Sequence, residues 1–245
     1  YKATYTSTVN KYKIDFVDED GTTVLDTQEV AYGETPVYQG ETPSKESTAE
    51  FTYTFAGWDK EVVSVTGAAT YKATYDSTKR SYKIDFVDEG GVTVLDSQEV
   101  AYGETPVYGG ETPTKEATAE FTYTFAGWDK EVGSVTGEAT YKATYSSTVN
   151  KYLIKFVDDD GETVLYENSF EYGTKPTYPY SNPTKAATAQ YSYTFTGWSP
   201  EVVEVSGDAT YVAQFSSATN KYLIKFVDED GVTVLYENSF EYGTK

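Results

Sequence analysis

The sequence repeats itself at a fixed interval of 70 residues. The stretch FTYTFAGW occupies 51–58, recurs unchanged at 121–128 and returns as YSYTFTGW at 191–198. The tryptophan positions give 128 − 58 = 70 and 198 − 128 = 70, so no insertion or deletion separates the copies. Self-similarity at a fixed period is typical of repeat architectures, and it limits the chain to units of this size.

A tyrosine-led segment marks the start of each unit. It reads YKIDFVD from Tyr12 and Tyr82, and YLIKFVD from Tyr152 and Tyr222. The opening YKATY (1–5) matches 71–75, and the closing segment matches 152–175 almost throughout, so we expect the chain to be a window of a longer array. The predicted organisation is 1–11, the last strand of a preceding repeat plus a connector; 12–81, 82–151 and 152–221, complete repeats; and 222–245, the first hairpin of a further, truncated repeat.

Composition indicates folded units with small aromatic cores. The chain has 38% hydrophobic and 24% charged residues, with 25 Tyr and 12 Phe but no Met, Cys or His. Units of this length bury about 60% of their unfolded surface, and aromatic rings supply more buried area per residue than aliphatic side chains. Without Cys or His, disulfides, thiol chemistry and Ser-His-Asp sites are excluded, although a Ser-Lys pair stays formally open.

The net charge of −20 argues against nucleic acid as a partner. Binding to a phosphate backbone depends on Lys and Arg, which displace counterions, and this chain has a large acidic excess. The excess favours solubility. No stretch approaches the ~18 apolar residues of a membrane span, and no cofactor motif is present.

Alternating side chains predict four strands in each repeat. Tyr12, Ile14 and Phe16 share one face, 18–21 is a turn, and a second strand follows with Val24 and Val30. Segment 41–50 could form a short helical turn, and 51–58 and 69–75 alternate as two further strands. The expected order is β-β-(short helix or loop)-β-β, so the fold class is mainly β, α+β at most. In the second repeat we expect an aromatic face, covered by aliphatic side chains, made of Phe121, Tyr123 and Phe125 with Ile84, Val94 and Val100.

These motifs resemble the Listeria-Bacteroides repeat family, also called internalin B-type repeats. The matching residues are Tyr12, Val30–Gly33 (V-x-Y-G), Tyr53–Trp58 (Y-x-F-x-G-W) and Ala69–Tyr71 (A-x-Y). The FVDEDG run is also similar to the mucin-binding repeats of bacterial adhesins. Both resemblances imply β-grasp-like domains in extracellular bacterial surface proteins, with the first and last strands parallel in one sheet.

Short connectors predict an extended array. A β-grasp chain enters at one end of the domain and leaves at the other, and only 76–81 and 146–151 lie between neighbouring repeats. At ~3.3 Å per residue, a strand and a connector give a pitch of about 40 to 45 Å. We therefore expect an elongated rod of repeats, each of which folds on its own core.

The acidic turn is the first candidate for chemistry. Asp18, Glu19 and Asp20 recur as 88–90, 158–160 and 228–230, and clustered carboxylates suit acid/base catalysis or calcium. The second copy replaces Asp20 with Gly90, and Asp and Gly are favoured in hairpin turns for conformational reasons alone. A charged turn is the preferred interpretation. A Lys13-based isopeptide crosslink is disfavoured, because position 13 becomes Leu153 in the third repeat.

The tryptophans and loop tyrosines are the second set of candidates. Trp58, Trp128 and Trp198 could stack on sugars, but a Trp that follows an aromatic strand more often closes a small core. The loop tyrosines, Tyr38, Tyr108, Tyr178 and Tyr180, are better candidates for a contact surface, although packing on their own repeat is the preferred role.

The sequence favours a structural spacer or stalk of a bacterial cell-surface protein or extracellular fibre, because a variable number of near-identical repeats suits a function of length. The alternative is a multivalent adhesin module that binds glycan, mucin or a host protein. We expect no enzyme activity and assign no catalytic, cofactor-binding or metal-binding residue. The expected partners are neighbouring repeats, with a host or matrix glycoprotein or other fibre subunits as further candidates, at an extracellular location.

Overall fold

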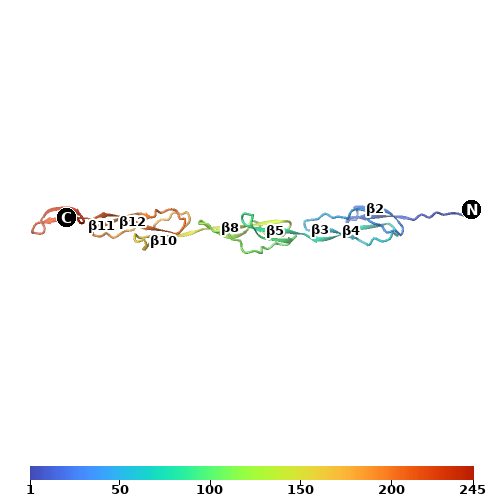
Figure 1. Ribbon diagram of the computed structural model, residues 1–245, viewed down its shortest axis with the longest axis horizontal. Helices are drawn as coiled ribbons and strands as arrows, with labels where there is room; N and C mark the ends of the chain where they lie inside the picture. The colour runs from blue at the N-terminus through green and yellow to red at the C-terminus, as the bar shows by residue number, and fades with distance from the viewer. The chain divides into compact units, whose positions relative to one another are not determined.

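The computed structural model describes residues 1–245 and contains strands but no helix (Figure 1). Three four-stranded sheets have the orders β2-β1-β4-β3, β6-β5-β8-β7 and β10-β9-β12-β11, and β13 and β14 form a two-stranded sheet. The strands are β1 (Lys11–Val17), β2 (Val24–Ala31), β3 (Phe51–Trp58), β4 (Ala69–Lys79), β5 (Ser81–Val87), β6 (Val94–Ala101), β7 (Phe121–Trp128), β8 (Ala139–Val149), β9 (Lys151–Val157), β10 (Val164–Glu171), β11 (Tyr191–Ser199), β12 (Ala209–Thr219), β13 (Lys221–Val227) and β14 (Val234–Glu241). No helix that could span a membrane is present.

The first repeat shows the topology of all three. Strands β1 and β2 form an antiparallel hairpin, and Gly21, with φ of 73°, lies in its turn, where a positive φ favours glycine. Strand β4 then pairs with β1 in parallel, with Ile14 opposite Ala69 and Val17 opposite Lys72. The expected parallel pairing of the first and last strands is therefore present.

Strand β4 pairs with two different strands along its length. Its first residues pair with β1, whereas the part from Ala73 to Lys79 pairs antiparallel with β3. The β1–β2 hairpin and the β3 strand thus pair with different stretches of one long strand. The third repeat has the same arrangement in β9 to β12.

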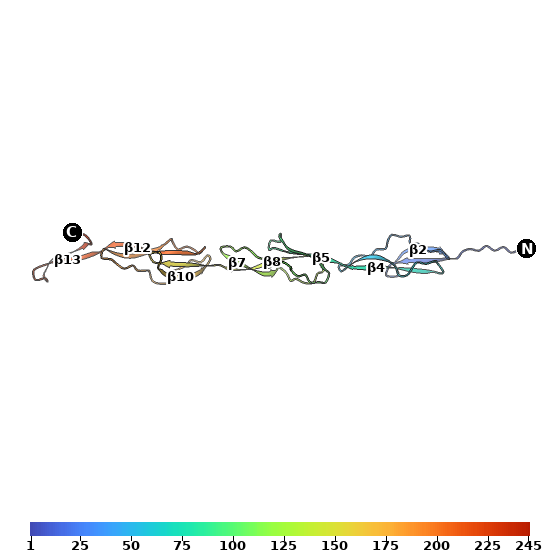
Figure 2. The same cartoon turned by 60° about the horizontal axis from the view of Figure 1, so that its bottom comes forward.

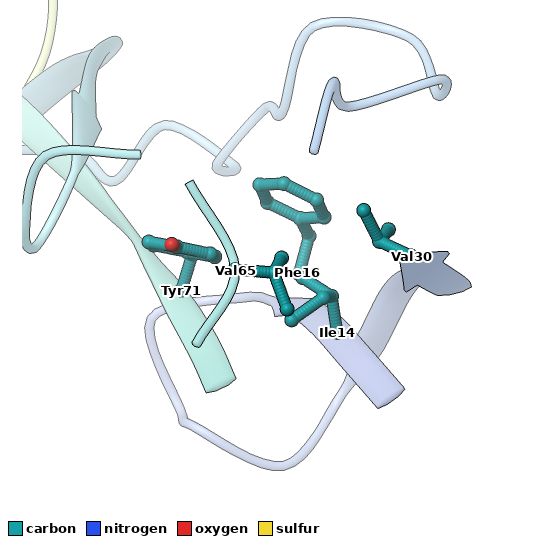
Figure 3. Close-up of a cluster of buried hydrophobic side chains, with 5 residues drawn as sticks. All are labelled: Ile14, Phe16, Val30, Val65 and Tyr71. Atoms are coloured by element: carbon teal, nitrogen blue, oxygen red, sulfur yellow. The ribbon is translucent and has the colours of Figure 1, made fainter. Parts of the chain in front are cut away.

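The core of each repeat lies against the first of these stretches. In the first repeat the buried cluster is Ile14, Phe16, Val30, Val65 and Tyr71, and Figure 3 shows these side chains converging. The Phe16 ring lies 4.7 Å from Trp58 and 5.2 Å from Tyr71, measured between ring centroids. Full burial of such a side chain contributes roughly 1.5–3 kcal/mol, so a few aromatic rings dominate the stability of a small unit.

Of the two alternatives for 41–50, a short helix or a loop, the structure has the loop, which crosses the repeat as irregular chain with Pro43 buried. The predicted cover of the aromatic face is wrong, because Phe121, Tyr123 and Phe125 are only half-buried and Val94 is 52% exposed. The register of the first repeat gives the reason: the equivalent aromatic strand pairs with β4 only beyond the residues that face β1.

The predicted connector between repeats is mostly strand. Strand β4 continues to Lys79 and β5 begins at Ser81, so Arg80 alone separates them (Figure 2). Asn150 and Asn220 are the single intervening residues at the next two junctions. Extended backbone from one repeat therefore leads directly into the first strand of the next.

The chain divides into two compact units whose boundary passes through the second repeat. One unit is Tyr1–Pro113 with Ala126–Thr144, and the other is Thr114–Phe125 with Tyr145–Lys245. The boundary crosses strands β7 and β8. The junction between the first and second repeats therefore lies within one unit, and the junction between the second and third repeats lies within the other.

Candidate functional site at the repeat junctions

One residue at each junction is hydrogen-bonded to both repeats through its backbone. The Arg80 N–H donates to the Glu50 carbonyl at 2.8 Å, and the Arg80 carbonyl accepts from the Tyr102 N–H at 2.9 Å. Asn150 makes the same pair with Glu120 and Tyr172, at 2.8 and 2.9 Å. The bridging residue thus ties a loop of the preceding repeat to the residue that directly follows the second hairpin strand of the following repeat.

The side chain of the bridging residue adds a second tie. Asn150 Nδ2 donates to the Thr118 carbonyl at 2.8 Å and to the Ala119 carbonyl at 3.0 Å. Asn220 repeats this with the Thr188 carbonyl at 2.8 Å. At the first junction Arg80 takes the role through Nη1, 2.9 Å from the Thr48 carbonyl. Asn and Arg both carry N–H donors, so the exchange of residue type preserves the contact.

The tyrosine that begins each following repeat completes the contact. The Tyr82 hydroxyl donates to the Ala49 carbonyl at 2.5 Å, and the hydroxyls of Tyr152 and Tyr222 donate to Ala119 and Ala189 at 2.6 Å. The Arg80 guanidinium also lies 5.0 Å from the centre of the Tyr82 ring. We call the bridging residue, this tyrosine and the loop that they contact the junction clamp.

The loop of the clamp is held in shape by its own threonine. The Thr48 Oγ1 accepts from the Phe51 N–H at 2.9 Å, and the Thr48 N–H donates to the Phe51 carbonyl at 2.9 Å. A Ser or Thr that bonds backbone nearby in this way stabilises a turn. The turn directs the carbonyls of residues 48–50 at the next repeat. The donors of the clamp are amide, hydroxyl and guanidinium groups and its acceptors are backbone carbonyls, so the clamp can fix neighbouring repeats.

The carboxylates of the acidic turn hold the first hairpin. Asp20 accepts hydrogen bonds from the Thr22 and Thr23 N–H groups and the Thr23 hydroxyl, which hold the Asp20 pKa well below its usual value. Asp18 accepts from the Tyr75 hydroxyl at 2.8 Å. Burial, together with this bond, raises the pKa of Tyr75 to about 12. Glu19 pairs with Lys45 at 2.7 Å. The structure thus gives each of the three a conformational role.

The tryptophans and loop tyrosines pack against the cores. Trp58 contacts Phe16, and Tyr38 lies 5.4 Å from Phe16 and 5.1 Å from Trp58. Trp128 and Tyr108 repeat the arrangement around Phe86. Tyr180 differs, because it is 64% exposed. Lys13, considered for a crosslink, pairs with Asp15 at 2.9 Å and its side chain is 60% exposed.

Sequence reasoning did not identify the clamp. Arg80 and Asn150 were expected in connectors, and the Thr-Ala-Glu at 48–50 was part of the segment expected as a short helical turn or loop. A signal exists in the sequence, because this tripeptide precedes the aromatic strand in the first two repeats and returns as Thr-Ala-Gln at 188–190. The sequence alone does not show that this tripeptide contacts residues some 30 positions later in the chain.

Comparisons with known proteins give a likeness to solved structures. No protein-family profile matches the chain, and no curated protein matches it. A solved structure described as "Streptococcal High Identity Repeats in Tandem (SHIRT) domains 3-4 from cell surface protein" is similar at 21% sequence identity and a TM-score of 0.30. The likeness covers 57% of this chain and 99% of that chain. The functional proposal therefore rests on the contacts within this chain.

Proposed function

We propose that this chain is a structural spacer or stalk of a bacterial cell-surface protein or extracellular fibre. Its β-grasp-like repeats would act at an extracellular location, without enzyme activity or a cofactor, and would project a distal domain from the cell. The partners of each repeat are then its own neighbours. The observation that carries the proposal is the parallel pairing of the first and last strands of each repeat.

This pairing suits a chain under tension. The chain enters a repeat at the start of β1 and leaves at the end of β4, and the two strands are neighbours that run in the same direction. A pull on the two ends draws the strands past each other along their length. The ladder bonds between Ile14 and Val17 on one strand and Ala69 and Lys72 on the other are then loaded together rather than one after another.

The junction clamp supports the same function. A single bridging residue joins the last strand of one repeat to the first strand of the next, and its hydrogen bonds reach both repeats. A spacer requires that length be kept from repeat to repeat. The hydrogen bonds of the clamp at every junction hold the neighbouring repeats together and oppose bending of the chain between them.

The register within a repeat gives a length that can be measured. Ile14 pairs with Ala69 in the parallel ladder, so Lys11, three residues before Ile14, lies beside residue 66. The residue that corresponds to Lys11 in the next repeat is Ser81, the first residue of β5. The chain thus advances 81 − 66 = 15 residues along the strand direction, or about 50 Å at ~3.3 Å per residue. We propose that three repeats form a rod on the order of 150 Å long.

Small-angle X-ray scattering of the whole chain tests the proposal. A rod of this length has a radius of gyration on the order of 40 Å, whereas a compact globule of 245 residues has one of about 18 Å. A value near the compact one would overturn the spacer.

A multivalent adhesin module is the second candidate function. Binding by the third repeat is favoured by the exposed aromatic ring of Tyr180, whereas the first two repeats carry Gly40 and Gly110 at this position.

A further inference from the structure

The third repeat differs from the first two in one surface region. Three substitutions occur together there: an aspartate becomes Tyr166, a glycine becomes Tyr180, and a tyrosine of the last strand becomes Phe215. The corresponding residues are Asp26, Gly40 and Tyr75 in the first repeat and Asp96, Gly110 and Tyr145 in the second.

In the first repeat the aspartate closes the loop that follows β2. Asp26 Oδ2 accepts from the Gln39 N–H at 3.0 Å and from Gln28 Nε2 at 2.8 Å. Asp96 makes the equivalent bonds in the second repeat. Tyr166 replaces these bonds with ring contacts, 6.3 Å from Tyr178 and 5.9 Å from Tyr180 between centroids.

The glycine of the first two repeats leaves no space for a side chain. A Cβ placed on Gly40 would lie 2.3 Å from the Tyr38 hydroxyl oxygen, and one on Gly110 would lie 2.4 Å from that of Tyr108. The loop tyrosine therefore covers this position in both repeats. In the third repeat Tyr180 occupies the position, and Tyr178 instead lies 5.6 Å from the Tyr180 ring.

The third substitution frees a carboxylate. In the first repeat the Tyr75 hydroxyl donates to Asp18, and in the second the Tyr145 hydroxyl donates instead to the Thr114 carbonyl. Phe215 has no hydroxyl to give to Asp158, the residue equivalent to Asp18. Within the chain, the Asp158 carboxylate accepts one hydrogen bond, from the Asp159 N–H at 2.9 Å. A carboxylate has about four acceptor sites, so Asp158 keeps capacity for further donors.

Of the three substituted residues, Tyr180 lines a cavity of 280 Å³, which also includes Asp158. Asp158, Tyr178, Tyr180, Ser181, Asn182 and Thr184 contribute to its lining. The side chains of Ser181, Asn182 and Thr184 make no hydrogen bond within the chain. Lys185 pairs with the neighbouring Asp159, and its charge also acts on Asp158, which reduces the attraction of the cavity for a cation. The cavity thus offers an aromatic surface, an acceptor with free capacity and several neutral hydrogen-bonding groups.

We propose that this cavity binds a neutral sugar residue of a glycan. The apolar C–H face of a sugar ring would lie on Tyr180, and its hydroxyls would donate to Asp158 and bond with Asn182 and Thr184. Acidic glycans are disfavoured by Asp158 and by the net charge of −20. The proposal rests on the second candidate function and adds a ligand to it. A chain that binds no sugar can still be a spacer, which the scattering experiment tests separately.

Titration of the whole chain with neutral methyl hexosides, followed by amide NMR, tests the proposal. For a single sugar we expect a Kd on the order of 1 mM. The shifts should be confined to residues around 158 and 178–184, with the equivalent positions 88 and 108–114 of the second repeat as an internal control. Tyr180→Gly restores the residue of the other two repeats, so it should fold and should weaken binding by about tenfold or more.

Three results would overturn the proposal. The first is that no methyl hexoside moves the signals of the third repeat. The second is that the second repeat responds equally. The third is that a folded Tyr180→Gly chain binds as tightly as the wild type. If methylammonium rather than a sugar shifted these residues, the cavity would be a site for a basic side chain of a protein partner.

Discussion

Removing a single hydroxyl from a junction clamp should loosen that junction. The Tyr82 hydroxyl donates to the Ala49 carbonyl of the preceding repeat at 2.5 Å, and Tyr82→Phe deletes only this bond. A net hydrogen bond between protein groups contributes about 0.5–1.5 kcal/mol, and the partly exposed position favours the lower half of that range. The expected change in the opening equilibrium of the junction is therefore about two- to fivefold.

Hydrogen exchange measures this opening directly. The Arg80 and Tyr102 amides donate across the junction, so their exchange should accelerate by this factor in the Tyr82→Phe chain. Buried core amides of the same repeat, such as that of Phe86, should change less because they exchange only when the repeat itself opens.

Tyr12 supplies a matched control within the same chain. It begins the first repeat as Tyr82 begins the second, but its hydroxyl has no preceding loop to contact in this chain. Tyr12→Phe should therefore leave the exchange of the Tyr32 amide, which donates to the Asn10 carbonyl, unchanged. Equal acceleration in both variants, or none at Arg80 in Tyr82→Phe, would show that the tyrosine hydroxyl does not hold the junction.

Two further predictions concern the interior of a repeat and its acidic turn. Trp128→Ala removes a ring 4.7 Å from Phe86 and 5.0 Å from Tyr108, so calorimetry should show a loss of about 3–5 kcal/mol, whereas Val92→Ala at an 86% exposed site should change little. An unchanged melting profile for Trp128→Ala would contradict the core role. Hydrogen bonds from Thr163 and Glu162 lower the pKa of Asp160 in the folded chain. The ionised Asp160 side chain therefore stabilises the fold above the ordinary Asp pKa of about 4, and this stabilisation is lost as the pH falls toward the lowered pKa. Chemical denaturation should show Asp160→Asn less stable than wild type at pH 7, with a difference that shrinks below about pH 4; a constant difference would refute the linkage.

Local patterns predicted the strands well because each depends on a few neighbouring residues. The segment 51–58 is β3 residue for residue, and the acidic segment at 18–21 is the hairpin turn. Val65 was missed, since it lies in a loop without periodicity and becomes 3% exposed only when that loop returns over the β1–β2 hairpin. There its N–H donates to the Glu34 carbonyl and its carbonyl accepts from Gly33.

The stagger of the sheet could not be predicted either. Alternation identifies which residues share a face, but not the stretch of a partner strand against which that face lies. Because β4 is eleven residues long, its first part can pair with β1 and its last part with β3. The last residues of β4 have the polar composition of a connector. The sequence therefore indicated a short connector at 76–81, where pairing with β3 in fact continues the strand to Lys79.

The remaining question is how far a repeat depends on its neighbours, and the second repeat can answer it. Its core of Ile84, Phe86, Val100, Val135 and Tyr141 lies entirely within 82–151, so we expect this segment to fold cooperatively when expressed alone. The isolated segment lacks the Ala49 carbonyl, which accepts from the Tyr82 hydroxyl, and the Arg80 carbonyl, which accepts from the Tyr102 amide. Its melting temperature should therefore be lower than that of the same repeat in the whole chain.

A thermodynamic cycle separates the junction from the core. Tyr82→Phe should destabilise the second repeat in the whole chain but have no effect in the isolated segment, because there the hydroxyl bonds only to water. Phe86→Ala is the comparison, since its buried ring should be costly to lose in both contexts. If Tyr82→Phe were equally destabilising in both, the hydroxyl would act within its own repeat and the junction would contribute nothing through it. An isolated segment that stayed unfolded would show instead that the repeats depend on their junctions for folding itself.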